Sequence, residues 1–434
     1  GIENRPFLPN YLIFPKTMAV LRYGYNSSVE IEPAAAPAAR QFEPQGSESG
    51  GKGDARSPID PGEATMTALK ELLDYPPLAK CTTPGDRVVL ALDSAAPQVA
   101  EVAAAVVRSL VAAGVGVEGI SILLPQPSDG ETEDPCRLID AELRDQIQVL
   151  VHAPDDRRGL AYLAADDSGE AILVSRALHE ADVVLPIGCL HDDRAAGYFG
   201  IHGVVYPVFS DEKTMQRFRG LGSLHADGAR KRQLIERVDN VAWLLGVTLT
   251  IQIVPGGGGR IAAVLAGESN AVRARGRELY DGLWRRTVAR QSELVVAAIE
   301  GPPSVQTWGN FGRAIEAAGS FADDGGTIVV CCELASMPGP GIRHLAAGDA
   351  SRGEAMRRVS RHRPPDALPA AQLASALDRN KVYLLSRLDP AAVEELDMVP
   401  LETPEELMRL VRQYPPCTVL QDAQYIIPCD SPVV

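Results

Sequence analysis

The sequence lacks the features that mark membrane-spanning and nucleic-acid-binding proteins. No apolar run reaches the roughly 18 residues that a helix needs to cross a bilayer. Aromatic residues make up only 5% of the 434 residues, and the net charge is −15. Stacking on single strands and attraction to phosphate backbones or anionic lipids are therefore disfavoured. We expect neither a nucleic-acid partner nor a membrane partner.

The chain also lacks recognisable metal, disulfide and nucleotide motifs. Its seven cysteines are odd in number and form no C-x-x-C pair, and its seven histidines form no H-E-x-x-H cluster. A preassembled metal cage is not expected, so the metal ligands stay unknown. The four-glycine run at residues 256–259 lacks a P-loop frame, and no G-x-G-x-x-G is found. Unpaired, reduced cysteines favour a cytoplasmic protein.

What the chain does have is a regular alternation of predicted strands and helices. The apolar stretch at 88–92 predicts a strand, 98–113 has helical apolar spacing, and 183–187 predicts another strand. This order is typical of mostly parallel sheets flanked by helices. We predict an α/β protein with two Rossmann-like domains, residues 1–275 and 280–418, and a cleft between them.

One segment interrupts this pattern. Residues 33–58 are rich in proline, alanine, glycine and serine and contain almost nothing that could be buried. Such a composition predicts a flexible insertion rather than an element of the fold.

The stretch from 181 to 207 reads ADVVLPIGCLHDDRAAGYFGIHGVVYP. It opens as a buried strand that we expect to break at Gly188, and a polar turn then carries His191. Open α/β sheets bind ligands beyond the carboxyl ends of their strands, and glycines there let backbone approach a ligand. The pattern predicts a binding site at His191, and an ordinary strand–loop connection is the alternative.

This stretch resembles the nickel-pincer lactate racemase family of 2-hydroxyacid racemases and epimerases. In that family a strand reading eaD-x-x-i-x-iG leads to a catalytic histidine and a GfsGGaK-x-x-lPG loop. Here HEADVVLPIG leads to His191 and then to GYFGIHGVVYP. The resemblance implies a nickel-pincer nucleotide, hydride transfer, His191 as catalytic base, and a tail, residues 419–434, that returns to the first domain.

Several positions depart from the family pattern around the cofactor. The lysine that carries the cofactor falls on Gly203, and the nickel-ligand histidine falls near Phe218 or Arg219. His202 precedes the lysine position, and a neutral imidazole there could bind nickel or the cofactor. A solvent-facing loop histidine is the alternative for His202.

Substrate-binding positions depart from the pattern as well. The D-x-x-R-P motif reads DSAAP, which retains Asp93 but replaces the arginine that grips a carboxylate with Ala96. Asp93 could bind a cofactor or ligand hydroxyl, or cap the following helix. The turn expected to hold a second catalytic histidine, ILLPQPSDG at 122–130, contains none, and racemisation requires a base on each face of the substrate.

In the second domain, the Q-x-x-K of the family corresponds to Asn310 and Arg313. Their i, i+3 spacing places both side chains on one helical face, where they could hold the phosphate or carboxylate of a cofactor or ligand. Two solvated helix residues are the alternative. The resemblance predicts that Asp93, His191, Asn310 and Arg313 line one cavity.

Three functions are compatible with these residues. The first is a 2-hydroxyacid racemase or epimerase, an isomerase whose cofactor is held without the lysine. The second is a divergent paralogue that binds a small metabolite or protein partner without nickel or racemase activity. The third is an unrelated use of the scaffold, such as a nucleotide-binding enzyme, which the missing glycine motifs disfavour.

Overall fold

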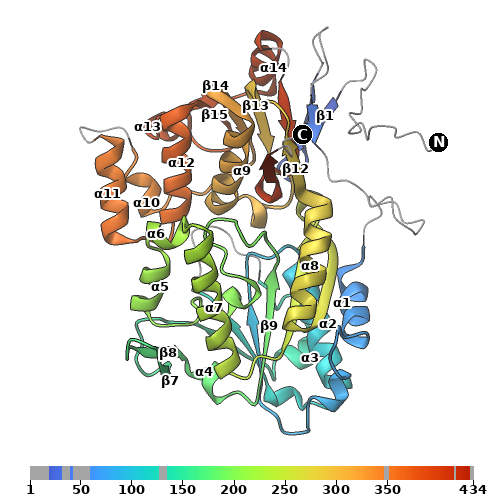
Figure 1. Cartoon of the computed structure of the whole chain (residues 1–434). Helices are drawn as coiled ribbons and strands as arrows, with labels where there is room; N and C mark the ends of the chain where they lie inside the picture. The colour runs from blue at the N-terminus through green and yellow to red at the C-terminus, as the bar shows by residue number, and fades with distance from the viewer. Residues whose placement is uncertain are drawn as a thin grey trace, which may run out of the picture.

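The computed structural model describes residues 19–31, 40–42, 59–126, 134–346, 351–414 and 417–430. Its core consists of two six-stranded sheets in separate halves of the molecule, with helices packed against them (Figure 1). The two halves are connected by helix α8 (Ser269–Trp284), which follows the last strand of the first sheet and leads into the second half. The predicted α/β class with mostly parallel sheets is confirmed.

The first sheet has the order β11-β10-β9-β4-β5-β6, in which every neighbouring pair is parallel except β10 and β11. Its strands are β4 (Val88–Leu92), β5 (Ile120–Leu124), β6 (Gln148–Val151), β9 (Val183–Cys189), β10 (Leu249–Pro255) and β11 (Ile261–Glu268).

Strand β4 shows why this sheet is covered on both faces. All five of its residues are buried, and successive side chains of a strand point to opposite faces. Val88, Leu90 and Leu92 pack into a cluster with α1 (Pro61–Lys70) and α2 (Val99–Ala112). Val89 and Ala91 pack into a second cluster on the other face, with residues of α4 (Arg176–Glu180) and α7 (Gly228–Leu244).

The second sheet has the order β16-β15-β14-β13-β17-β3 and is parallel throughout. Its strands are β13 (Ser292–Ala298), β14 (Ala322–Cys331), β15 (Lys381–Leu385), β16 (Val399–Leu401), β17 (Thr418–Leu420) and β3 (Arg40–Phe42). Helices α9 (Trp308–Phe321) and α12 (Ala367–Arg379) cover one face, and α14 (Pro404–Gln413) covers the other.

The described N-terminal segments lie with the second sheet, which their local sequence did not indicate. The hairpin of β1 (Ala19–Tyr23) and β2 (Ser27–Ile31) shares a hydrophobic cluster with β13 and α14. Strand β3 lies inside the segment expected to be a flexible insertion, yet it pairs with β17. The rest of that insertion lies outside the described residues, and the division at residue 275 stays a prediction.

The C-terminal tail contacts elements of both halves. Strand β17 belongs to the second sheet, whereas β18 (Ile427–Asp430) pairs in parallel with β12 (Arg285–Val288), directly after α8. The Tyr280 hydroxyl of α8 donates a hydrogen bond to the Tyr425 carbonyl at 3.0 Å. The return of the tail to the first domain stays a prediction.

Two local expectations need correction. Strand β9 does not break at Gly188 but continues through it to Cys189, because β10 pairs with it along residues 187–189. The apolar stretch at 171–174 likewise predicts a strand within the α/β alternation, but β8 (Ala171–Ser175) forms a separate antiparallel ribbon with β7 (Leu160–Ala165). The remaining helices are α3 (Ala141–Arg144), α5 (Glu212–Phe218), α6 (Leu221–Leu224), α10 (Pro340–Arg343), α11 (Arg352–His362) and α13 (Pro390–Glu395). None of the helices in the described ranges is long and apolar enough to cross a membrane.

Each sheet has one switch point, where the chain leaves neighbouring parallel strands in opposite directions. In the first sheet it lies between β4 and β9, and in the second between β13 and β17. Loops diverge there and leave a crevice at the carboxyl ends of the strands, which is the usual ligand position in open α/β sheets. The first of these points carries the candidate site.

Candidate functional site

Asp93 and His191 lie at the switch point of the first sheet. Leu92 of β4 pairs with Ile187 of β9, and the Asp93 backbone N–H donates to the Ile187 carbonyl at 2.9 Å. The Asp93 carboxylate accepts a hydrogen bond from the Ala95 N–H at 3.0 Å. Helix α2 begins only at Val99, so Asp93 stabilises the turn after the strand and does not cap the helix.

His191 follows β9 and is surrounded by tyrosine rings. Its ring centroid lies 5.5 Å from that of Tyr198 and 6.3 Å from that of Tyr280, and it stacks on Tyr425 at 6.4 Å. Burial, followed by the positive charge of Arg313, lowers the pKa of His191 well below its usual value. The imidazole is therefore neutral at neutral pH, and its unprotonated nitrogen can accept a hydrogen bond from a ligand.

Asn310 and Arg313 reach this region from α9 of the second half. Asn310 donates its side-chain amide to the Val305 carbonyl at 2.8 Å and accepts from the Arg313 guanidinium at 3.0 Å. Asn310 thus holds the guanidinium in a defined position. Within the described ranges, no carboxylate oxygen lies within ion-pairing distance of Arg313, which is half-buried.

The charge of Arg313 acts on both residues of the first switch point. It lowers the pKa of His191, and it opposes the burial that raises the pKa of Asp93. Electrostatic influence of this kind requires short separations in a poorly solvated region. Residues from the two halves are therefore brought near one another, although one cavity shared by Asp93, His191, Asn310 and Arg313 stays a prediction.

A small hollow that His191 helps to line lies between the loop after β9 and helix α8. Asp93, Asn310 and Arg313 do not line it. Its lining residues are Leu190, His191, Asp192, Asp193, Tyr198, Ile201, Arg273, Arg277, Tyr280 and Asp281.

The lining residues that come from α8 could have been identified from their spacing in the sequence. Arg273, Arg277 and Tyr280 are spaced by four and three residues on α8, so they occupy one face of that helix. Arg277 forms an ion pair with Asp193 of the facing loop. No comparable signal marked Tyr425, which comes from the distant tail.

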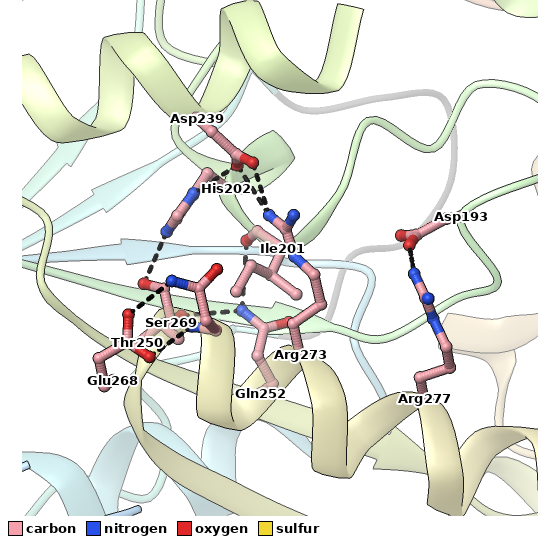
Figure 2. A network of polar contacts seen from close by, with 11 residues as sticks. Asp193, Ile201, His202, Asp239, Thr250, Gln252, Glu268, Ser269, Arg273 and Arg277 are labelled. Atoms are coloured by element: carbon pink, nitrogen blue, oxygen red, sulfur yellow. Dashed lines mark hydrogen bonds and ion pairs between the residues drawn. The ribbon is translucent and has the colours of Figure 1, made fainter. Parts of the chain in front are cut away.

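His202 belongs to a closed polar network beside this hollow (Figure 2). Its Nδ1 lies 2.7 Å from an Asp239 carboxylate oxygen, and its Nε2 lies 2.8 Å from the Ser269 hydroxyl. Arg273 donates to both oxygens of the same carboxylate at 2.8 Å. Both ring nitrogens of the buried histidine are thus occupied, and neither is free to ligate nickel or a cofactor.

The order Ser269–His202–Asp239 matches the connectivity of a serine hydrolase triad, but the surroundings do not match that chemistry. Ser269 and His202 are both buried. The backbone N–H groups of Asn270 and Ala271, at the start of α8, already donate to the Glu268 carboxylate. These two N–H groups are therefore not available to an oxyanion, and the network connects α7, α8 and the His202 loop structurally.

The residues at the implied cofactor position do not fit a covalently bound nickel-pincer nucleotide. Gly203 has no amine, although a Cβ placed there would meet only the Phe199 Cβ, at 3.8 Å. Phe218 and Arg219 supply no imidazole where the family places a ligand. Across the described ranges, no three His, Cys, Asp or Glu side chains are grouped so that they could hold a metal ion.

Comparison with known proteins places this geometry in context. Residues 51–230 match the model of the lactate racemase N-terminal domain. The fold resembles the lactate racemase apoprotein from Thermoanaerobacterium thermosaccharolyticum, with a TM-score of 0.74 and 15% identity over 95% of this chain and 100% of that one. A crystal structure of a protein from Thermotoga maritima matches with a TM-score of 0.63 and 14% identity over 86% and 100%. Among curated proteins no match was found.

The matched segment, residues 51–230, contains both Asp93 and His191. The chain also shares its overall fold with the lactate racemase apoprotein. Residues 51–230 thus resemble the lactate racemase N-terminal domain, and the chain as a whole shares the fold of the apoprotein.

Proposed function

We propose that this lactate racemase-like protein binds a small hydroxy-carboxylate between Arg313 and His191, without a covalently attached nickel-pincer nucleotide. The observation that carries the proposal is the half-buried guanidinium of Arg313, which is held by Asn310 and has no carboxylate partner in the described part of the chain. A partly desolvated cation of this kind favours an anionic ligand.

The neutral imidazole of His191 supports recognition of a hydroxyl group on the same ligand. Its pKa is lowered well below the usual value, so it accepts a hydrogen bond at neutral pH. A ligand whose carboxylate meets Arg313 can direct a neighbouring hydroxyl toward this ring. Asp93 is the second polar group that could contact the ligand. Seven unpaired cysteines support a cytoplasmic location as part of this proposal.

The second candidate is a 2-hydroxyacid racemase or epimerase that uses a nickel-pincer nucleotide bound without the lysine. The match of residues 51–230 to the lactate racemase N-terminal domain and the place of His191 after β9 favour it. The absence of an amine at Gly203 and the occupied nitrogens of His202 weigh against it. We therefore derive no catalytic step through nickel.

Calorimetric titration tests the binding proposal. The ligands are D- and L-lactate, propionate as the analogue without a hydroxyl, and phosphate as a simple anion. Arg313→Ala should weaken lactate binding by roughly 10- to 100-fold, the usual value of a charge-assisted contact. Arg232→Ala, which removes an exposed arginine of α7, is the matched control and should leave binding unchanged.

His191→Phe tests the hydroxyl contact separately. The wild-type protein should prefer lactate over propionate by about 5-fold, which corresponds to one hydrogen bond, and the variant should lose this preference. Equal lactate binding by wild type and Arg313→Ala would refute the proposed site.

Metal analysis separates the two candidates. The protein is produced together with the enzymes that make the pincer cofactor, desalted, and analysed for nickel by mass spectrometry. Near-stoichiometric nickel would support the racemase candidate, and hydroxyacids would then be screened for racemisation. Nickel no higher than in a metal-free control would support ligand binding without the cofactor.

A further inference from the structure

A second cavity lies at the opposite edge of the first sheet from His191. It has a volume of about 140 Å³ and opens between the amino ends of β9 and β10, the last turn of α2 and the loop before β4. Its apolar walls include Leu110, Leu185 and Leu249, all of them buried. No part of the candidate site contributes to it.

The size of this cavity indicates the size of its ligand. An engineered cavity of about 150 Å³ lined by apolar side chains binds benzene. A space of similar volume suits one six-membered ring or a branched chain of equal size. The lining is partly polar and partly apolar, so the favoured ligand covers the leucine side chains and also offers a polar group to the hydroxyls.

The polar groups of the cavity indicate the chemistry of that ligand. The Tyr75 and Thr248 hydroxyls lie 2.7 Å apart in the lining, and either can donate to a further partner. The one carboxylate of the lining, Asp182, already accepts from the Arg87 backbone at 2.9 Å and from its guanidinium at 3.2 Å. The lining contains no Lys, Arg or His, so an anionic ligand has no partner.

We infer that this cavity is a binding site for a small neutral alcohol with an aromatic or branched apolar body, whose hydroxyl meets Tyr75 and Thr248. The apolar body would contact the leucines at the amino ends of β9 and β10. The inference does not depend on the function proposed for His191.

The test uses the full chain with phenol, benzene and benzoate as probes, each followed by calorimetry and by the shift in unfolding temperature. Phenol should bind about 5-fold more tightly than benzene, as expected for one hydrogen bond, and benzoate should not bind. Absence of phenol binding up to its solubility limit would overturn the inference, as would equal binding of benzoate.

Leu110→Phe provides a matched pair with Leu110→Met. The larger ring fills the cavity and should abolish phenol binding, whereas the volume-conserving methionine should retain it. Unchanged phenol binding by a folded Leu110→Phe would place the ligand elsewhere.

A readout in the wild-type protein removes any dependence on the folding of the variant. Cys81 lines the cavity and is partly exposed, so bound phenol should slow its alkylation by iodoacetamide severalfold. Alkylation of Cys429, the other partly exposed cysteine, should not change. Equal alkylation of Cys81 with and without saturating phenol would overturn the inference.

Discussion

The two sheets of this protein end in comparable switch points with opposite electrostatic surroundings. Asp93 and His191 follow neighbouring strands of the first sheet, and Glu300 and Asp422 follow neighbouring strands of the second. At the second switch point, other residues of the protein form hydrogen bonds with both carboxylates. Both Asp422 carboxylate oxygens lie 3.2 Å from the Gly258 N–H, and the Gln421 amide donates to Glu300 at 3.2 Å.

The first switch point has fewer internal partners. His191 is surrounded by tyrosine rings, and the only hydrogen bond of the Arg313 guanidinium within the described ranges is to Asn310. Buried polar groups in native proteins are normally satisfied, and exceptions need a functional explanation. The comparison teaches that equivalent positions in two α/β sheets can serve different purposes. The second contributes to the packing of the two halves through Gly258 and Asp422, whereas the first leaves the Arg313 guanidinium with a single hydrogen bond within the described ranges.

The largest effect that tests this comparison is expected at Asp422. Burial and the negative charge of Glu300 raise the pKa of Asp422 to about 8. The folded protein therefore keeps a proton that the unfolded chain releases near its ordinary pKa of about 3.9. Stability should fall as pH rises between about 4 and 8, by up to about 1.4 kcal/mol per pH unit.

Asp422→Asn cannot ionise, so it should remove this slope and be more stable than wild type toward pH 8. Urea unfolding at several pH values measures the effect. Asp155→Asn, the same change at an exposed residue, should leave the slope unaltered. Parallel pH profiles for wild type and Asp422→Asn would show that the second switch point is not electrostatically strained.

A smaller loss of stability is expected at the glycine that closes the second switch point. Gly258 has a φ of +68°, and a Cβ there would lie 3.2 Å from a Glu300 carboxylate oxygen. Gly258→Ala should destabilise the protein by about 1–2 kcal/mol, because alanine disfavours this backbone region. Gly282→Ala in α8, where a Cβ would meet nothing within 4 Å, should instead stabilise by roughly 0.5–1 kcal/mol. Equal effects in thermal unfolding would contradict this explanation.

The positions of Asp93 and His191 could be predicted from sequence, because parallel strands bring their carboxyl ends to one edge. The bounds of β4 could be predicted as well, since the local apolar pattern at 88–92 ends there. The sequence could not predict which short segments pair with strands far away along the chain. Strand β3 has only three residues and is identified by its pairing with β17, more than 370 positions away.

The hydrogen bonds of His202 could not be predicted for the same reason, because its partners are distant in the sequence. Its local sequence suggested a free imidazole in a glycine-rich loop, yet its two partners, Asp239 and Ser269, come from α7 and the start of α8. Only the packing of these helices determines that both nitrogens are occupied. Likewise, Tyr425 stacks on His191 from the tail, 234 positions further along the chain.

The first switch point should tolerate loss of its cation. Arg313→Ala removes a half-buried charge without a carboxylate partner, so its unfolding free energy should change by less than about 1 kcal/mol. Arg273→Ala removes the guanidinium that donates to both oxygens of Asp239, and it should cost about 2–3 kcal/mol. Chemical denaturation of both variants measures the contrast. A loss at Arg313 as large as that at Arg273 would mean that Arg313 is part of the structural packing.

The smallest effect is a shift in the titration of His191, which NMR of the ring protons can follow. The pKa of His191 is lowered first by burial and second by Arg313, so Arg313→Ala should raise it only in part. A carboxylate bound at Arg313 should raise it in the same direction, because the added negative charge favours the imidazolium.

The pH dependence of stability that His191 causes has the opposite sign to that caused by Asp422. Below the ordinary histidine pKa of about 6.5, the unfolded chain binds a proton that the folded His191 does not, so this residue lowers stability as pH falls. The two switch points therefore weaken the fold at opposite ends of the pH range. An unchanged His191 titration in Arg313→Ala would mean that the guanidinium does not act on the imidazole, and the proposed ligand site would lose its cation.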